Sequence, residues 1–520
     1  MAQKAADDDP LEPRPSRWLG RPCVRPLPLV PSPPSRSGTF SLAVLLLFLA
    51  ALPCGCSLKP PYQRPALPVP QHYPGAERDD AAALSLSDWS AFFADPELKR
   101  LVTLALERNR DLAMARQKVE EARAMYGIRR ADLLPGISAG ALAERSRTPA
   151  DLSLTGAPVT ANVFQAGLFL ASWELDFWGR VGSLKEAALE SYLASLEARR
   201  AVQVSLVAQV AQSYLQEREL TERVDLAEAT IKSRDESFRI ARRRFEVGSA
   251  SKLDAVQAET LLNQARAELA GLMRLRALNL NALALLTGGP VSLVPLPLTV
   301  VERDFLAVIA PGLPSDLLLN RPDVIAAEHE LKGANAAIGA ARAAFFPAIA
   351  LTGSFGSASS ELSGLFAAGS GAWSFTPAVS LPIFQGGRNV ANLELARARE
   401  REAVAAYERV LQRAFREVAD ALAQRHWLAE QVEAQKATLA SQTERTRLAR
   451  LRYDTGAATY LEVLDAERDR FSAQQALVQT RRALLFAGVE LYAALGGGGQ
   501  AAPGEPGGHA GDVRNGEAKP

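Results

Sequence analysis

The feature that most constrains this chain is a tight turn that occurs twice, each time between two long helical patterns. The two copies read RFEVGSASKLD from Arg244 and RYDTGAATYLE from Arg452. A glycine just past a helix can take the left-handed conformation that closes the C-terminus, and Gly248 and Gly456 have that position. Each copy therefore predicts a hairpin of two helices.

The residues after each glycine predict how the returning helix begins. Ser251 with Asp254, and Thr459 with Glu462, have the spacing of a capping box. Two unrelated helical turns could share such caps, because caps of this kind are common. The alternative is that the two hairpins belong to an internal duplication.

A longer match in register favours the duplication. The segment Asp111–Pro135 returns as Asp323–Pro347, and the matched pairs are Ala115/Ala327, Ala122/Ala334, Ala124/Ala336, Gly127/Gly339, Arg130/Arg342 and Ala131/Ala343. Gly288 and Gly496 match further on, so two repeats are expected, at about 100–290 and about 312–498.

The N-terminal region resembles an export leader. A Pro- and Arg-rich stretch precedes an apolar run from Phe40 to Leu52, which is shorter than the roughly 20 residues of a membrane-spanning helix. Residues 1–55 are therefore assigned to a signal segment. No other apolar run approaches 18 residues, so no membrane-spanning helix is expected. A formal net charge of +1 gives no electrostatic footprint for nucleic acid.

The three cysteines, Cys23, Cys54 and Cys56, all lie near the N-terminus, which excludes disulfides, zinc and a thiol nucleophile from the remaining body. Gly55-Cys56-Ser57 resembles a bacterial lipobox and predicts lipidation at Cys56. Ordinary signal cleavage is the alternative. Residues 56–86 are expected to form a lipidated, Pro-rich linker, and residues 499–520 a disordered tail.

After the proline that ends each matched segment, the hydrophobic period changes to two, which predicts strands. Helix with little interruption is expected from near Ser87 towards Leu134, and it should end at Pro135. The four strands are expected at about 136–146, 164–176, 348–357 and 372–383, two in each repeat, and each pair is predicted to form a hairpin.

Helical patterns of roughly 60 residues follow each hairpin, over Val181–Glu246 and Gly387–Asp454, and would extend about 90 Å. Their coiled-coil spacing predicts apolar seams that pack on neighbouring helices; one such seam is Val404, Tyr407, Leu411, Phe415, Val418 and Leu422. The returning helices, Ser251–Thr287 and Thr459–Leu495, would supply part of that packing.

Four short amphipathic strands cannot close a barrel and would leave sheet edges exposed. Bacterial outer-membrane barrels hold eight strands or more, so two or three copies of the chain are needed to close one. The chain is therefore predicted to be an α+β membrane protein that oligomerises. Its long helices would continue the barrel into the periplasm.

Several motifs resemble the outer-membrane efflux protein (TolC-like) family, and in particular its lipoprotein branch, which serves resistance-nodulation-division pumps. They are Gly55–Pro65 (GCSLKPPYQRP), Asn320–Asp323 (NRPD), Phe345–Pro347 (FFP) and Tyr460–Ala466 (YLEVLDA). The resemblance implies a homotrimer with a twelve-stranded outer-membrane barrel, four strands per chain, and a long periplasmic α-helical barrel. The efflux channel domain would occupy residues 87–498, with an equatorial belt that includes Pro290–Val308.

The resemblance also implies a mechanism and partners. The chain would be a lipid-anchored exit duct that passively conducts small molecules, while an inner-membrane resistance-nodulation-division transporter and a periplasmic adaptor supply the energy. Leu461 and Asp465 have the spacing of the family's periplasmic gate. The adaptor-facing hairpin tips would carry Gly248, Ser251, Gly456 and Thr459. Alternatively, Asp465 faces solvent and Leu461 packs in the helical seam.

Three other functions compete with the exit duct. The histidines argue against an enzyme, because the four of them are scattered and lack metal-ligand spacing: His72, His329, His426 and His509. No catalytic, cofactor-binding or metal site is therefore expected. His329 and His426 are interpreted as helix-surface residues. An exit duct for type I protein secretion stays open. A periplasmic coiled-coil scaffold without a pore would place Trp373, Phe375 and Leu381 on a soluble core.

Overall fold

The structure is a computed structural model and describes residues 57–70, 73, 88–301 and 315–498. The helices are α2 (Trp89–Phe92), α3 (Pro96–Arg108), α4 (Arg110–Ala131), α5 (Arg180–Glu246), α6 (Lys252–Thr287), α7 (Leu298–Val301), α8 (Pro322–Ala343), α9 (Arg388–Asp454) and α10 (Tyr460–Ala494). The strands are β1 (Ile137–Thr148), β2 (Val159–Leu175), β3 (Ala348–Ser359) and β4 (Gly371–Ser380). A short 3-10 helix, Ser315–Asn320, precedes α8.

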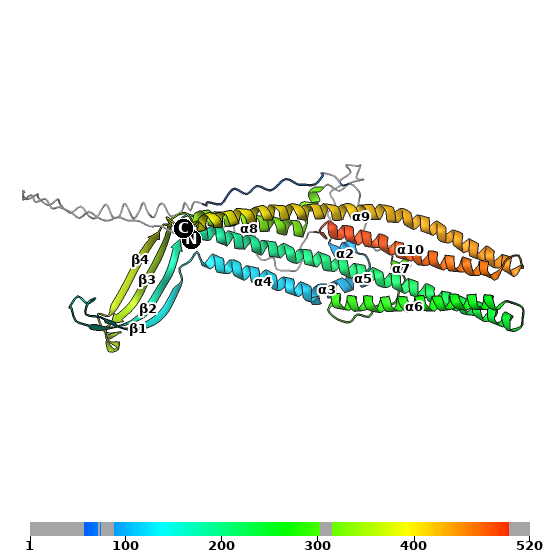
Figure 1. Cartoon of the computed structure of the whole chain (residues 1–520), viewed down its shortest axis with the longest axis horizontal. Coiled ribbons are helices and arrows are strands. Elements are labelled where there is room, and N and C mark those ends of the chain that lie inside the picture. Colours follow the sequence, from blue (N-terminus) through cyan, green and yellow to red (C-terminus); the bar gives the residue numbers. More distant parts are fainter. Residues whose placement is uncertain (1–56, 71–72, 74–87, 302–314, 499–520) are drawn as a thin grey trace, which may run out of the picture. The chain divides into compact units, whose positions relative to one another are not determined.

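Two long helices, α5 and α9, organise the described chain. Each has 67 residues and therefore extends about 100 Å at 1.5 Å per residue. Each begins after a glycine with positive φ, Gly179 or Gly387, directly after the strands of its repeat. Figure 1 shows α6 returning along α5 and α10 returning along α9, which gives the two predicted helical hairpins.

The apolar seam predicted on α9 is buried. Tyr407, Leu411 and Val418 have no exposed surface, and Val404 and Phe415 pack against them. The residues opposite this seam come from α8, which packs against both α5 and α9. Each repeat thus supplies helices that cover the other repeat, so the duplicated halves share one core.

An aromatic cluster lies where α2 and α3 meet the C-terminal end of α10. The ring of Phe92 stacks on Tyr492 at a centroid distance of 4.3 Å, and Tyr73 stacks on Phe415 at 4.7 Å. Leu298 of α7 is buried in the same cluster. The expected belt thus contributes Leu298 to the core, and its residues 302–308 lie outside the described residues.

The helical run predicted from near Ser87 towards Leu134, with little interruption, is present as three successive helices, because the chain breaks twice. Asp95 caps α3 by accepting a hydrogen bond from the Leu98 amide at 2.8 Å, and Asn109 caps α4 by accepting one from the Leu112 amide at 2.9 Å. The Asn109 amide also donates to the Leu286 carbonyl of α6 at 3.0 Å. Tertiary packing on α6 therefore fixes the second break.

The strands form one antiparallel sheet in the order β1-β2-β3-β4. The two predicted hairpins are present, and β2 pairs with β3 to join the two repeats across the sheet. A bulge interrupts β2 between Leu170 and Trp173. The sheet is therefore continuous between the repeats but leaves β1 and β4 as open edges in one chain.

Two strand boundaries differ from those predicted. β2 begins at Val159 instead of about 164, because β1 continues to Thr148 and the two residues pair across the hairpin. β4 ends at Ser380 instead of about 383, since its partner β3 begins opposite, at Ala348. Pro382 also lacks the N–H that another ladder bond would require.

One helix, α6, differs from the expectation that no helix has the length and composition to span a membrane. Among the described residues, α6 alone is long and apolar enough, by length and composition, to cross a membrane. Its apolar side chains Met273, Leu278 and Leu285 are exposed. Its polar ones attach it to α5, since Arg276 pairs with the buried carboxylate of Glu217 at 2.6 Å.

Candidate functional site

The sheet has one apolar face. Because cross-strand partners project to the same side, the observed register gathers its side chains into one surface: Ile137, Ala139, Ala141, Ala143, Phe164, Leu168, Leu170, Ile349, Leu351, Phe355, Trp373, Phe375 and Val379. Trp373 is 76% exposed, and Phe375 and Val379 are similarly uncovered. A water-soluble protein does not leave so large an apolar ribbon uncovered.

This exposure bears on the scaffold interpretation. That interpretation predicted that Trp373, Phe375 and Leu381 pack on a soluble core, and all three are exposed. The prediction is therefore wrong for the described chain, and the ribbon needs an apolar medium or a partner to cover it.

The opposite face of the sheet is richer in polar side chains, although Leu142, Val163 and Phe169 also lie on it. It carries Ser138, Gln165, Thr352, Ser354, Ser374 and Thr376. The Ser354 and Ser374 hydroxyls are 2.7 Å apart across β3 and β4. Alternation of apolar and polar faces is the pattern of strands that separate lipid from a water-filled lumen.

Side chains fix the sheet to the long helices. The Arg180 guanidinium, at the start of α5, donates to both carboxylate oxygens of Glu174 at 2.8 and 2.5 Å. The Trp178 indole donates to the Pro347 carbonyl at 2.8 Å and stacks on Phe346. The FFP motif therefore lies at the junction, where it joins the strands of one repeat to the helix of the other.

The two hairpin tips have nearly the same backbone geometry. Gly248 and Gly456 have φ of +77° and +76°, which only glycine adopts without strain. The Ser251 and Asp254 capping box is present, with the Asp254 amide donating to Ser251 Oγ at 3.2 Å.

The capping box predicted at the second tip is absent. Thr459 occupies the N-cap of α10, but its side chain makes no cap bond. The carboxylate of Glu462 pairs instead with Arg452 at 3.0 Å. The spacing therefore predicted the start of α10 correctly, but the ion pair with Arg452 draws the Glu462 side chain away from the cap.

The hairpins contact each other near their tips. The Arg244 guanidinium donates to the Tyr453 hydroxyl, and Tyr453 also contacts the Tyr460 ring. A groove of about 630 Å³ runs between the hairpins beside this contact, and its lining includes Ser233, Glu236, Ser237 and Ile240. A groove between two helical hairpins can accept another helix.

The predicted gate residues lie on one face of α10. Leu461 is 45% exposed, so it does not pack in the seam of this chain. The Asp465 carboxylate is partly exposed and pairs with Arg468 at 3.1 Å. Val463 and Leu464 are the residues buried against the neighbouring helices. Leu461 and Asp465 are therefore not buried against the neighbouring helices of this chain.

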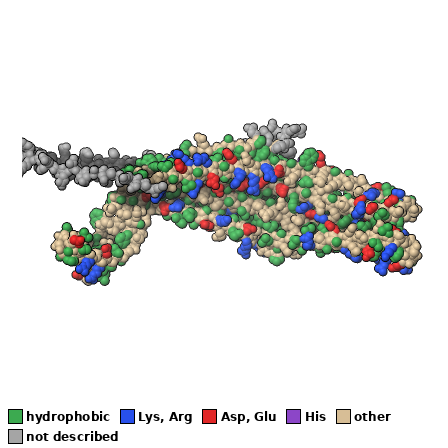
Figure 2. Space-filling view, viewed as in Figure 1, with side chains coloured by type: hydrophobic (Ala, Val, Ile, Leu, Met, Phe, Trp, Pro, Cys, Tyr) green, Lys and Arg blue, Asp and Glu red, His purple; other side chains and the backbone are tan. Residues whose placement is uncertain are grey.

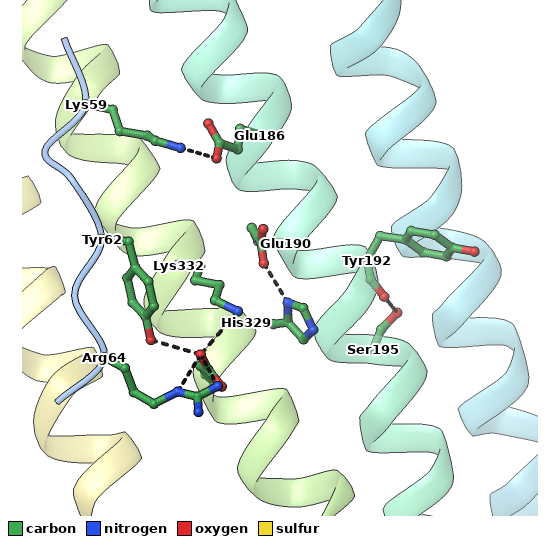
Figure 3. Close-up of polar contacts among 10 residues, drawn as sticks. Lys59, Tyr62, Arg64, Glu186, Glu190, Tyr192, Ser195, His329 and Lys332 are labelled. Atoms are coloured by element: carbon green, nitrogen blue, oxygen red, sulfur yellow. Dashed lines mark hydrogen bonds and ion pairs between the residues drawn. The ribbon is translucent and has the colours of Figure 1, made fainter. Parts of the chain in front are cut away.

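An N-terminal strap, residues 57–70, runs along α8, as Figure 3 shows for its central part. The Leu58 carbonyl accepts from Arg342 at 3.1 Å, and the Pro60 carbonyl accepts from Asn335 at 3.0 Å. Lys59 forms an ion pair with Glu186 of α5. The strap thus bridges α8 and α5.

Glu328 is the main anchor of the strap. Its side chain is 9% exposed and accepts from Arg64 at 2.7 Å and from the Tyr62 hydroxyl at 3.2 Å, while Lys332 pairs with it at 3.2 Å. Burial opposes the charged form, but the hydrogen bonds from Arg64 and Lys332 outweigh it and hold the pKa of Glu328 below its usual 4.5. Nothing in the sequence pattern distinguished this glutamate from a solvated helical charge.

The interpretation of His329 as a surface residue is wrong. Its Nδ1 lies 2.6 Å from a carboxylate oxygen of Glu190, and both side chains are largely buried between α8 and α5 (Figure 3). His426 is exposed, as interpreted. The expected lipidation site, Cys56, lies outside the described residues, as do the signal segment and the tail.

Comparisons with known proteins decide the family. The model of the outer membrane efflux protein family matches residues 101–289 and 313–497. The chain belongs to the outer membrane efflux protein family. Outer membrane protein OprJ of Pseudomonas aeruginosa is 47% identical over 466 residues, which are 89% of this chain and 97% of OprJ. The toluene efflux pump outer membrane protein TtgI of Pseudomonas putida is 45% identical, over 87% of this chain and 98% of TtgI.

A solved structure is also similar. The open state of the MtrE outer membrane channel of Neisseria gonorrhoeae superposes with a TM-score of 0.77 at 39% identity, over 86% of this chain and 99% of MtrE. This outer membrane efflux protein accordingly has the trimeric TolC-like fold, in which three copies complete the twelve-stranded barrel and the helices extend into the periplasm. The apolar ribbon faces lipid and the polar face lines the lumen.

Proposed function

We propose that this efflux protein is the passive exit duct of a tripartite pump. An inner-membrane resistance-nodulation-division transporter and a periplasmic adaptor supply the energy. The observation that carries the proposal is the two-faced sheet, uncovered on both sides in one chain and joined directly to helices of 67 residues. Such a chain separates lipid from water only as part of a tube.

The proposed substrates are small toxic molecules, including apolar organic compounds and drugs. TtgI is named for toluene efflux, and a further relative, ArpC of Pseudomonas putida, for antibiotic efflux. The polar lumen face of serines and threonines offers hydrogen bonds without a specific pocket. The duct therefore conducts what the transporter delivers.

The proposed adaptor contact is the pair of hairpin tips, with Gly248, Ser251, Gly456 and Thr459 at the turns. The groove between the hairpins supports the proposal, since its mixed charged and apolar lining suits a helix of another protein.

The proposed gate is a ring of Leu461 and Asp465 from three chains. Leu461 is exposed in one chain, and three Asp465 carboxylates around an axis would repel one another and attract cations. The variant L461A/D465N should raise single-channel conductance in planar bilayers, because it removes the apolar constriction and the charges. The matched control is Glu462→Gln, on the same turn. Unchanged conductance in L461A/D465N would remove the gate assignment.

We also propose that Cys56 is acylated and held in the inner leaflet of the outer membrane. The strap supports this, since the Leu58 carbonyl accepts a hydrogen bond from Arg342, at the end of α8 and only six residues before β3 begins. Labelled palmitate should enter the wild-type chain and not Cys56→Ala. Equal labelling of both, or of neither, would contradict the anchor.

A complementation assay tests the proposed function. A Gram-negative strain that lacks its own exit duct but retains adaptor and transporter should regain resistance to small toxic molecules when this chain is expressed. Resistance should vanish when the transporter is also deleted. Restored secretion of a type I protein substrate without restored resistance would favour the secretion duct instead.

A further inference from the structure

The apolar face of the sheet ends in two positive charges. Along β1, Arg145 and Arg147 share the face of Ile137, Ala141 and Ala143, because side chains alternate with period two. Glu144 projects to the lumen face. The first strand was expected to end at about residue 146, so the continuation of the lipid-facing row to Arg147 appears only in the structure.

The position of the two arginines along the strand sets their height in the membrane. At about 3.4 Å per residue, Arg145 lies about 27 Å and Arg147 about 34 Å along β1 from Ile137. A strand tilt of about 40° reduces these distances to about 21 and 26 Å, whereas the apolar band of outer-membrane barrels is about 25 Å tall. Both guanidinium groups therefore lie at the outer rim of that band.

These charges are unpaired and have polar neighbours. Within the described residues, neither Arg145 nor Arg147 makes an ion pair or a side-chain hydrogen bond, and both are exposed. Their cross-strand partners on the same face are Asn162 and Thr160, which can also donate hydrogen bonds. In Figure 2, charged side chains of the sheet gather at the end away from the helices.

We propose that Arg145 and Arg147, with Thr160 and Asn162, bind the phosphate groups of a phosphorylated glycolipid in the outer leaflet. Guanidinium groups recognise phosphate oxygens through paired hydrogen bonds. Below them, Ala139, Ala141 and Ala143 leave a shallow apolar surface that continues the lipid-facing ribbon, on which acyl chains can lie. The ligand is a lipid, since the basic pair and this surface share one face.

The test uses the full-length trimer, delipidated in detergent and titrated in native mass spectrometry. The probe is a hexa-acylated glucosamine disaccharide that carries two phosphates, and its phosphate-free analogue is the control lipid. The variant R145Q/R147Q should bind the phosphorylated lipid at least about tenfold more weakly than wild type, because it loses charge-assisted hydrogen bonds. The phosphate-free lipid should bind all variants equally weakly.

Two controls keep the result specific. The variant R399Q/R409Q removes two exposed arginines in the first third of α9, outside the sheet, and should bind as wild type does. Excess inorganic phosphate should compete only weakly, because it lacks acyl chains. The variant R145K/R147K keeps the charge but loses the paired geometry and should bind severalfold more weakly than wild type; it carries the test if R145Q/R147Q does not assemble.

Three outcomes would overturn the proposal. The first is equal affinity of R145Q/R147Q and wild type for the phosphorylated lipid. The second is equal binding of the phosphorylated and phosphate-free lipids by the wild-type trimer. The third is a loss of trimer heat stability in R145Q/R147Q with unchanged lipid binding, which would assign the arginines to contacts between subunits.

Discussion

The strap anchor gives the most specific stability prediction. In Glu328→Ala, the carboxylate that binds Arg64, Tyr62 and Lys332 is lost. A hydrogen bond to a charged group contributes about 1.5–3 kcal/mol, and Arg64 is half-exposed, so water replaces part of the loss. We expect attachment of the strap to weaken by about 2 kcal/mol, which is roughly 30-fold in its opening equilibrium.

Hydrogen–deuterium exchange of the purified trimer measures this opening directly. The backbone amides of residues 62–69, other than Pro65 and Pro68, should exchange roughly 30-fold faster in Glu328→Ala, while α9 should keep its wild-type rates. Glu330→Ala is the matched control, because Glu330 lies two residues further along α8 and is exposed. Equal exchange of the strap in both variants would refute the assignment of Glu328 as its anchor.

The same anchor predicts a pH dependence. Because the folded-state pKa of Glu328 is lowered, its contribution is complete above the ordinary value of 4.5 and is lost as pH falls through the lower folded-state pKa. Strap exchange, corrected for intrinsic rates, should therefore be constant from neutral pH to about 5 and rise below about 4.5. An increase that begins near neutral pH would contradict this cause.

Three glycine substitutions extend the test, each with an internal control where the duplication offers one. Gly339→Ala should loosen the strap, since a Cβ there would lie 3.0 Å from the strap backbone, whereas its repeat partner Gly127 has open space and Gly127→Ala should be neutral in the same exchange assay. Gly167→Ala would place a Cβ 2.5 Å from a carbonyl oxygen of β3 and should lower the dissociation temperature of the trimer on semi-native gels, while Gly140→Ala should not. Gly456→Ala should cost roughly 1–2 kcal/mol of backbone strain, measured as faster proteolysis at that tip only.

The sequence predicted the elements whose period is long and regular. The 67-residue helices, the glycine turns and the alternating strands all follow from local patterns that Gly248, Gly456 and the matched prolines delimit. The buried Tyr407 and Leu411 were also predictable, because a coiled-coil seam repeats many times. Such patterns predict structure reliably because the same apolar residues that set the period are the ones that tertiary packing buries.

Single-residue tertiary contacts were not predictable. Glu328 and His329 lie on α8 among other charged residues, and only the packing of the strap and of α5 removes them from water. The short breaks at Asp95 and Asn109 were not located, because tertiary packing helps to fix them, as the bond from the Asn109 side chain to the Leu286 carbonyl of α6 shows.

The central claim is that one face of the sheet meets lipid and the other lines water in a tube built from several chains. It is tested most directly by single cysteines at Trp373, Ser374, Phe375 and Thr376, in trimers reconstituted into vesicles, with the unsubstituted chain as background. A membrane-impermeant thiol reagent should label positions 374 and 376 and leave 373 and 375 unlabelled. Equal labelling at all four positions, or the reverse alternation, would contradict the account.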